Sequence, residues 1–149
     1  QQKIREKGQT LTASVEPGAV MVVGDRDKLV QVLTNYVSNA YQYSPEGASI
    51  RIEITRQGDH ARVAVIDNGY GISAEDQQQL FTKFYRVDNS MTREVGGTGL
   101  GLSIVKQIIE LQGGEVEVER AGRFQANDFY IGQYPVTFQQ YQIFLDALD

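Results

Sequence analysis

Cysteine is absent from the 149 residues of this chain, and histidine occurs once. Without cysteine the chain cannot form a disulfide, a thiolate nucleophile or a cysteine-ligated metal site. No apolar run approaches the roughly 20 residues that a membrane-spanning helix needs, and the polar start does not resemble a signal peptide. The net charge of -5 argues against nucleic acid or an anionic membrane as the main partner. We therefore expect neither nucleic-acid binding nor direct membrane contact by this fragment.

The remaining composition is that of an ordinary globular domain, with 41% hydrophobic and 22% charged residues. An extended segment over residues 10–25 is broken by the turn Pro17–Gly18. Alternating apolar residues from Ile50 to Val65 predict an antiparallel hairpin that turns at Gln57–His60. The run EVEVE near the C-terminus predicts a further strand.

Three segments have the apolar spacing of helices. The first follows a capping Asp25 and should stop near Ser44, because Pro45 disfavours helical geometry in the preceding residue. A short helix follows a Ser73 cap, and a longer one follows a glycine cluster and ends at Gly113–Gly114. The expected buried residues of the longer helix are Ile104, Val105, Ile108, Ile109 and Leu111. Together these elements predict an α+β fold with helices on one face of a mixed, mostly antiparallel sheet.

Two asparagines, Asn35 and Asn39, lie four residues apart on the first predicted helix and border its apolar stripe. Asparagine is a mediocre helix former, so two at partly buried positions need partners. One interpretation is that they hydrogen-bond to neighbouring loops. The other is that their amide oxygens face a cavity and help to hold a hard cation such as Mg²⁺.

Asp67 has the same strand parity as the inward-pointing Val63 and Val65, which predicts a carboxylate at the rim of the core. An isolated inward acid is costly unless it meets a hydrogen-bond donor, and an adenine amino group would be a suitable one. Gly69 and Gly71 would then let the backbone pass close to a flat ring. The alternative is a plain turn in which Asp67 accepts from backbone amides.

The run VGGTGLGLSIVKQI places four glycines directly before a predicted helix. Glycine inside a helix costs roughly 0.5–1 kcal/mol relative to alanine, so the cluster needs a reason. It predicts either a hinge or uncovered backbone amides that bind phosphate at a helix N-terminus, with a hydroxyl from Thr98. The pattern is not a Walker A loop, because G-K-[ST] is missing.

Taken together, these motifs resemble the ATP-binding domain of bacterial sensor histidine kinases, in the GHKL (Bergerat-fold) superfamily. In order, LVQVLTNYVSNAYQYSP resembles the N box, VIDNGYGIS the G1 box, LFTKFYRVD the F box and GGTGLGLSIVKQIIELQGG the G2 box. The run NSMTREVG would be the ATP lid, anchored by Phe81 and Phe84, for which core packing is the alternative. The implied fold is a two-layer α/β sandwich, and the resemblance covers roughly residues 8–119.

The resemblance also implies roles for individual residues. Asn39 would coordinate Mg²⁺, Asp67 would bind the adenine amino group, and Arg86 and Lys83 would position the phosphates. The implied nucleotide-binding residues are Asn35, Asn39, Tyr43, Asp67, Gly69, Gly71, Arg86, Gly97, Thr98, Gly99, Leu100, Gly101 and Leu102. The implied cofactors are therefore ATP and Mg²⁺.

Two features depart from the family pattern. The N box usually carries lysine where this chain has Gln42, which removes a charge-assisted phosphate contact of about 1.5–3 kcal/mol. The tail beyond the G2 box reads FYIGQYPVT and resembles the start of formylglycine-generating-enzyme-like (sulfatase-modifying-factor) domains. The alternative is that the tail supplies the last strand of the kinase domain and a covering helix.

These observations divide the chain into an upstream linker or helix end at 1–7, the ATP-binding domain at 8–122 and an extension at 123–149. The implied function is donation of the γ-phosphate of ATP to a histidine on a separate dimerisation domain, because His60 lies in a predicted hairpin turn. Implied partners are that upstream domain of the same protein and a response regulator receiver domain. The expected location is the cytoplasm, for a parent protein that could be anchored in a membrane. Alternatives are a GHKL-type ATPase clamp and a non-catalytic nucleotide-sensing module.

Overall fold

The computed structural model describes residues 2–18, 22–87, 96–121 and 124–132. In chain order its elements are α1 (Gln2–Glu6), β1 (Thr10–Val15), α2 (Arg26–Gln42), β2 (Ser49–Gln57), β3 (His60–Asp67), α3 (Ala74–Gln79), α4 (Gly101–Leu111), β4 (Glu115–Ala121) and β5 (Phe124–Gly132). In these residues no helix is both long and apolar enough to cross a membrane.

The strands form one mixed sheet in the order β1-β2-β3-β5-β4. β1 pairs with β2 in parallel, and each of the other neighbouring pairs is antiparallel. The β2–β3 hairpin has Gln57 opposite His60, so it turns where the alternation predicts. The parallel pairing of β1 requires a crossover, which α2 supplies.

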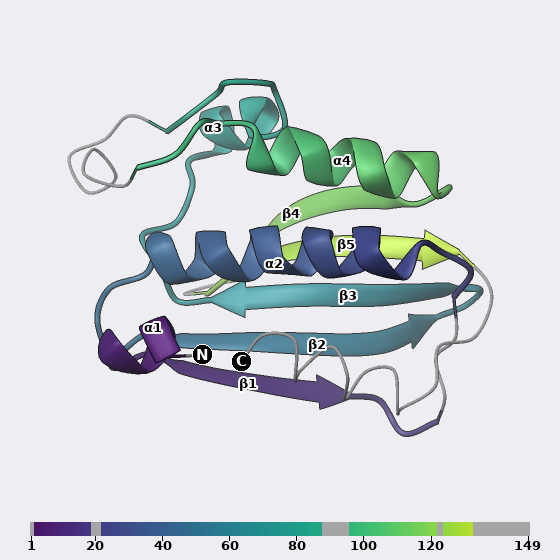
Figure 1. Ribbon diagram of the computed structural model, residues 1–149, viewed down its shortest axis with the longest axis horizontal. Helices are drawn as coiled ribbons and strands as arrows, with labels where there is room; N and C mark the ends of the chain where they lie inside the picture. Colours follow the sequence, from purple (N-terminus) through teal and green to yellow (C-terminus); the bar gives the residue numbers. More distant parts are fainter. Residues whose placement is uncertain (1, 19–21, 88–95, 122–123, 133–149) are drawn as a thin grey trace.

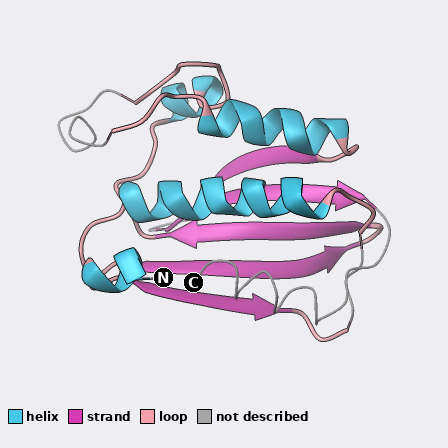
Figure 2. Ribbon diagram, in the orientation of Figure 1, coloured by secondary structure: helices cyan, strands magenta, loops and turns pink. Residues whose placement is uncertain are grey.

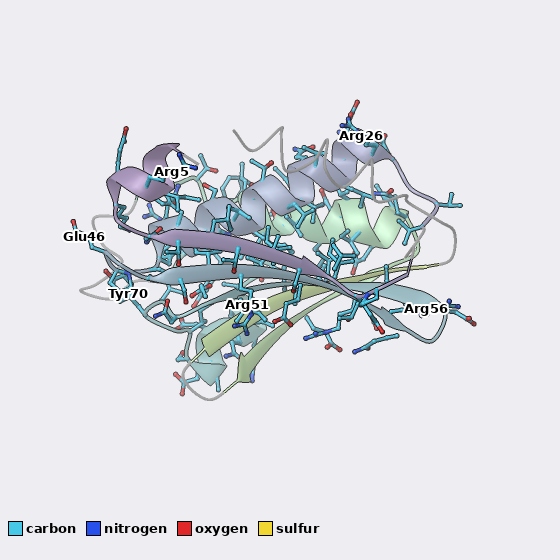
Figure 3. The ribbon with its side chains drawn as sticks, turned by 90° about the horizontal axis from the view of Figure 1, so that it is seen from below. Arg5, Arg26, Glu46, Arg51, Arg56 and Tyr70 are labelled. Atoms are coloured by element: carbon cyan, nitrogen blue, oxygen red, sulfur yellow. The ribbon has the colours of Figure 1, made fainter. Side chains whose placement is uncertain are left out.

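Helices α2 and α4 lie side by side on one face of the sheet and run in opposite directions (Figure 1, Figure 2). Their apolar sides share a core with the inward residues of β2 and β3. The largest fully buried side chains in this core include Tyr36, Ile52 and Ile109. Figure 3 shows Arg51 on the face of the sheet opposite to these helices. This arrangement confirms the predicted α+β fold with helices on one face.

Two predicted caps are confirmed. The Asp25 carboxylate accepts a hydrogen bond from the Lys28 amide at 3.1 Å, at the start of α2. The Ser73 hydroxyl accepts one from the Asp76 amide at 3.1 Å, at the start of α3. Each bond satisfies one of the amides that the first turn of a helix leaves without an internal partner.

The prediction of the buried side of α4 is wrong at one residue. Val105, Ile108 and Ile109 are buried, but Leu111 is 88% exposed. Leu111 is the last residue of α4, where the chain turns through Gln112 and Gly113 toward β4. No described element covers its side chain there. Ser103 is buried instead, and its hydroxyl donates to the Leu100 carbonyl at 2.9 Å.

Residues 124–132, at the start of the predicted extension, form strand β5 in the interior of the sheet between β3 and β4. Val63 of β3 faces Phe129 in the register. The first four residues of the run FYIGQYPVT, which resembles a formylglycine-generating-enzyme-like domain, lie in this strand. The rest of that run and the predicted covering helix lie outside the described residues. Most of the predicted ATP lid, residues 88–95, also lies outside them.

We expect Asp25→Ala to lower the free energy of unfolding by about 1 kcal/mol, because the Lys28 amide loses its acceptor. Urea denaturation followed by circular dichroism measures this loss. Asp27→Ala is the matched control: it removes the same charge from the first turn but only an exposed ion pair with Arg26. The control should lose only a few tenths of a kcal/mol. Equal losses in the two variants would show that negative charge near the helix end stabilises the domain, and that the capping hydrogen bond does not.

Candidate functional site

The predicted site residues gather at one end of the molecule, at the left of Figure 1. There, the end of β3 meets the C-terminal half of α2, the segment around α3 and the start of α4. Tyr43 is the C-terminal cap of α2, and Asp67 is the last residue of β3. The fold thus brings together four motifs that are separated by up to about 65 positions in the sequence.

Asp67 is buried, with only 7% of its surface exposed. Its Oδ1 accepts hydrogen bonds from the Gly69 amide at 2.8 Å and the Ser44 hydroxyl at 3.4 Å. Burial raises the pKa of the carboxyl above its ordinary value of 3.8, and the two hydrogen bonds oppose that rise. The plain-turn interpretation therefore accounts for Oδ1, whereas Oδ2 accepts no hydrogen bond from any described residue.

Gly69 follows Asp67 where the loop passes directly against the end of α2. A Cβ atom at this position would lie 2.5 Å from the Tyr43 carbonyl oxygen and 2.8 Å from the Ser44 hydroxyl. The Tyr70 amide donates to the same Tyr43 carbonyl at 3.0 Å. Any side chain at residue 69 would push the loop away from α2, so glycine is required here by close approach. Gly71 has a φ of +76°, which also favours glycine.

Asn35 and Asn39 are both half-buried on α2. The Asn35 amide nitrogen donates to the Gln31 carbonyl of its own helix at 3.1 Å. Its Oδ1 faces α4 and lies 3.1 Å from where a Cβ of Gly101 would stand. The Asn39 side chain makes no hydrogen bond to the described residues. The interpretation in which both asparagines bond to neighbouring loops is therefore wrong within the described structure, and the Asn39 amide oxygen has no partner among the described residues.

The glycine cluster leads into α4 through an exposed segment, Gly96–Thr98. A Cβ at Gly96 or Gly97 would meet no atom of the described residues within 4 Å, so among these residues the two glycines border open space. Leu100 is the N-cap of α4 and provides no side-chain hydrogen bond. The amides of the first turn of α4 therefore lack a capping side chain, which leaves them available to an anion. Leu102 packs against the hydrophobic core and fixes this end of the helix.

Gly99 ties the start of α4 to the predicted F box. The Phe84 amide donates to the Gly99 carbonyl at 2.9 Å. A Cβ at Gly99 would lie 2.7 Å from the Phe84 carbonyl carbon, and its φ is +70°. Both conditions exclude a side chain at residue 99, so the two backbones can pair only because of this glycine.

Phe84 itself is 72% exposed and has a φ of +65°, the one positive φ of a non-glycine residue in the described part of the chain. The core-packing alternative is therefore wrong for Phe84, whereas Phe81 is half-buried. Lys83 and Arg86, the predicted phosphate-positioning residues, flank Phe84 on the same segment and are exposed. The Phe84–Gly99 pairing thus brings the segment that carries both cations to the glycine cluster.

Sequence reasoning missed three polar residues at this end of the molecule: Lys7, Gln9 and Ser44. Ser44 is fully buried and bonds to Asp67, although the sequence marked it only as a helix stop. Lys7 and Gln9 donate to backbone carbonyls at the end of α2, more than 30 positions away. No local pattern in the sequence signals contacts over that separation.

We expect Gly99→Ala to destabilise the domain by about 1–2 kcal/mol or more, because alanine resists the left-handed conformation and its Cβ would meet the Phe84 backbone. Hydrogen exchange at the Phe84 amide should accelerate at the same time. Gly96→Ala is the control in the same segment, and it should change stability by less than about 0.5 kcal/mol. Unchanged protection of Phe84 in the Gly99→Ala variant would contradict this account.

We also expect Asp67→Asn to change how stability depends on pH. Because the folded pKa of Asp67 is raised, the folded state holds more protons than the unfolded state above pH 3.8. The unfolding free energy of the wild type should therefore fall relative to the variant as pH rises from 3.8 through the raised pKa. Denaturation of both proteins between pH 3.5 and 8 tests this, and a wild type that gains stability relative to the variant as pH rises would overturn it.

Comparison with known proteins agrees with this geometry. Residues 24–135 match the model of the histidine kinase-, DNA gyrase B-, and HSP90-like ATPase family. Sensor-like histidine kinase SenX3 of Mycolicibacterium smegmatis is 38% identical over 120 residues, which are 80% of this chain and 31% of that protein. This chain therefore spans less than a third of the length of that relative.

Solved structures give the same result. The mycobacterial sensor histidine kinase MprB superposes with a TM-score of 0.78 at 27% identity, over 91% of both chains. Histidine kinase ThkA, in its complex with response regulator protein TrrA, gives 0.74 at 29% identity, over 90% of this chain and 37% of that chain. The chain belongs to the histidine kinase-, DNA gyrase B-, and HSP90-like ATPase family, as a catalytic ATP-binding domain of the sensor histidine kinase type.

Proposed function

We propose that this domain binds Mg²⁺-ATP and presents the γ-phosphate to a histidine on a separate dimerisation domain. The observation that carries the proposal is the buried Asp67 carboxylate, whose Oδ2 accepts from no described residue. The 6-amino group of adenine is the kind of donor that such an acceptor needs. Guanine presents a carbonyl oxygen at the same ring position, so the site should discriminate against it.

The phosphates would lie against the start of α4. Its uncapped first-turn amides suit phosphate oxygens, and the open space at Gly96 and Gly97 allows them to approach the backbone. The Thr98 hydroxyl would add a donor, and Lys83 and Arg86 would add positive charge. Catalysis of phosphoryl transfer is mainly positioning and charge neutralisation, which a site of amides and two cations can provide.

Asn39 is the proposed protein ligand of Mg²⁺, with Asn35 beside it. Amide oxygens are suitable ligands for this hard cation, and the Asn39 oxygen has no hydrogen-bond partner in the described structure. The described residues contain no group of three or more His, Asp or Glu side chains that could hold a metal by themselves. Most ligands would therefore be phosphate oxygens and water. When bound, Mg²⁺ would offset phosphate charge.

Gln42 takes the place of the lysine that the N box usually carries. Its amide nitrogen donates to the Ser38 hydroxyl on its own helix at 3.3 Å. It therefore brings no positive charge to the site, and Lys83 and Arg86 are the proposed source of compensation. We expect a correspondingly weaker affinity for the phosphates than a lysine at this position would give.

The phosphate acceptor must come from outside this chain. His60 is its one histidine, and it is exposed at the opposite end of β3 from Asp67. Seven residue steps along a strand span about 23 Å, too far for direct transfer from a nucleotide held at Asp67. We propose that an upstream dimerisation domain of the same protein carries the acceptor histidine.

A response regulator receiver domain is the proposed downstream partner, supported by the complex of the related ThkA with TrrA. A cytoplasmic location would suit this exchange. For the domain limits, we propose residues 1–7 as the end of the upstream linker and the ATP-binding domain from residue 8 onward. The interior position of β5 supports assigning residues 124–132 to that domain, with any extension beginning after them.

Calorimetric titration with a non-hydrolysable ATP analogue, with and without Mg²⁺, tests the proposal. Asp67→Asn should weaken binding roughly 10- to 150-fold, because a hydrogen bond to a charged group contributes about 1.5–3 kcal/mol. Asn39→Ala should remove the Mg²⁺ dependence. Asp59→Asn makes the same chemical change in the exposed hairpin turn and should leave binding unchanged. A folded fragment that gives no heat at millimolar analogue would refute the proposal.

A further inference from the structure

The segment that leads into the domain holds the C-terminal end of α2. The Lys7 ammonium donates to the carbonyls of Ser44 at 2.7 Å and Tyr41 at 2.9 Å, and lies 5.0 Å from the centre of the Tyr41 ring. The Gln9 amide nitrogen donates to the carbonyls of Pro45 at 2.9 Å and Ser44 at 3.1 Å. The Tyr41 carbonyl belongs to the last turn of α2, where carbonyls have no partner within the helix, and Ser44 and Pro45 lie just beyond it. Lys7 and Gln9 thus hold both the helix end and the residues that follow it.

Figure 3 shows Arg5, Glu46 and Tyr70 at one end of the molecule, the end at which Figure 1 places α1 and the C-terminus of α2. The contacts are not a loose surface association. Gln9 is 4% exposed and Ser44 fully buried, and Lys7 is half-buried. The Gln9 Oε1 has no hydrogen-bond partner among the described residues, so what this residue contributes in the interior is its amide donor.

The other side of the same turn contacts the nucleotide site. We call residues 41–45 the α2 end segment. Its Ser44 hydroxyl donates to Asp67 Oδ1, and its Tyr43 carbonyl accepts from the Tyr70 amide. The α2 end segment therefore lies between two sets of contacts: Lys7 and Gln9 on one side, and Asp67 with its glycine loop on the other.

The link to Asp67 is sensitive to position. The Ser44–Asp67 hydrogen bond is 3.4 Å long, near the upper limit for such a bond, so a small shift of the α2 end segment would break it. The space for a Cβ at Gly69 is equally tight against Tyr43 and Ser44. If the segment moved away from Asp67, the carboxylate would lose the Ser44 donor. If it moved toward Gly69, it would compress the loop that follows β3.

We infer that Lys7 and Gln9 are positioning residues for the adenine-binding carboxylate, acting through the α2 end segment. The segment that leads into the domain would thereby influence the affinity for adenine. A conformational change upstream of residue 7 would alter the position of Asp67 without any contact between that segment and the nucleotide. This inference rests on the proposed role of Asp67. A purely structural cap would stabilise the domain equally but would not be coupled to Asp67.

A double-mutant cycle on the 149-residue chain separates these roles. Lys7→Met keeps the apolar stem and removes the donors, and Lys7→Arg retains a donor. Calorimetry with a non-hydrolysable Mg²⁺-ATP analogue should show a 3- to 10-fold weaker affinity for Lys7→Met and recovery of most of the loss in Lys7→Arg. In the Asp67→Asn background, Lys7→Met should change affinity less than 2-fold. Lys106→Met, which loses an exposed lysine paired with Glu110, is the control for charge.

The outcomes are distinguishable. If the wild type binds the analogue and depends on Asp67, but Lys7→Met weakens binding equally in both backgrounds, the inference is wrong and the proposed function stands. If the wild type does not bind, the proposed function fails first. All titrations are made at a temperature at which urea denaturation shows every variant to be more than 95% folded, so that loss of folded protein is not read as loss of affinity.

Ser44→Ala gives an independent readout if Lys7→Met does not fold. It removes the hydroxyl that holds the pKa of Asp67 down and leaves the backbone carbonyl for Lys7 and Gln9. The pH below which analogue binding weakens should therefore move upward in Ser44→Ala, and Ser44→Thr should restore it. An unchanged pH profile would show that the α2 end segment does not act through Asp67 and would overturn the inference.

Discussion

The burial of one carboxylate governs the architecture at the functional end of this domain. Asp67 ends a strand at the rim of the core, where burial removes most of the water that would hydrate an ionised group. The Gly69 amide and the Ser44 hydroxyl donate to one oxygen, which requires the loop after β3 to fold back against the end of α2. That fold leaves no space for a side chain at residue 69. The path of the loop, the glycine at residue 69 and the contact with the end of α2 are therefore consequences of the same requirement.

Much of this could be predicted because it depends on local periodicity. Strand parity places Asp67 beside Val65 on the inner face, and the alternation around Gln57–His60 defines the hairpin without knowledge of the rest. The same periodicity failed at Leu111. Spacing gives the direction in which a helical residue points but not whether another element covers it, and at the last turn of α4 none of the described elements does.

The contacts that could not be predicted join distant parts of the chain. β5 enters between β3 and β4, although a strand following β4 could equally have taken the outer edge. The Phe84–Gly99 pairing and the capping of α2 by Lys7 and Gln9 are likewise long-range. A glycine signals that backbone freedom or close approach is needed there, but not which segment comes close. Only the packed fold supplies the partner.

Unfavourable local features are concentrated at the functional end. Asp67 is a desolvated acid, the Gln9 Oε1 is buried without a partner among the described residues, and Phe84 holds a left-handed backbone while its ring is exposed. At the opposite end, by contrast, the Asp25 amide donates to Gln112, whose own amide donates back into α4. Such features persist only where the surrounding structure enforces them, and a ligand that donates to Asp67 relieves one of them directly. The core formed by α2, α4 and the sheet thus supplies the stability that offsets these unfavourable features. One end of the molecule can therefore keep polar groups without hydrogen-bond partners until a nucleotide binds.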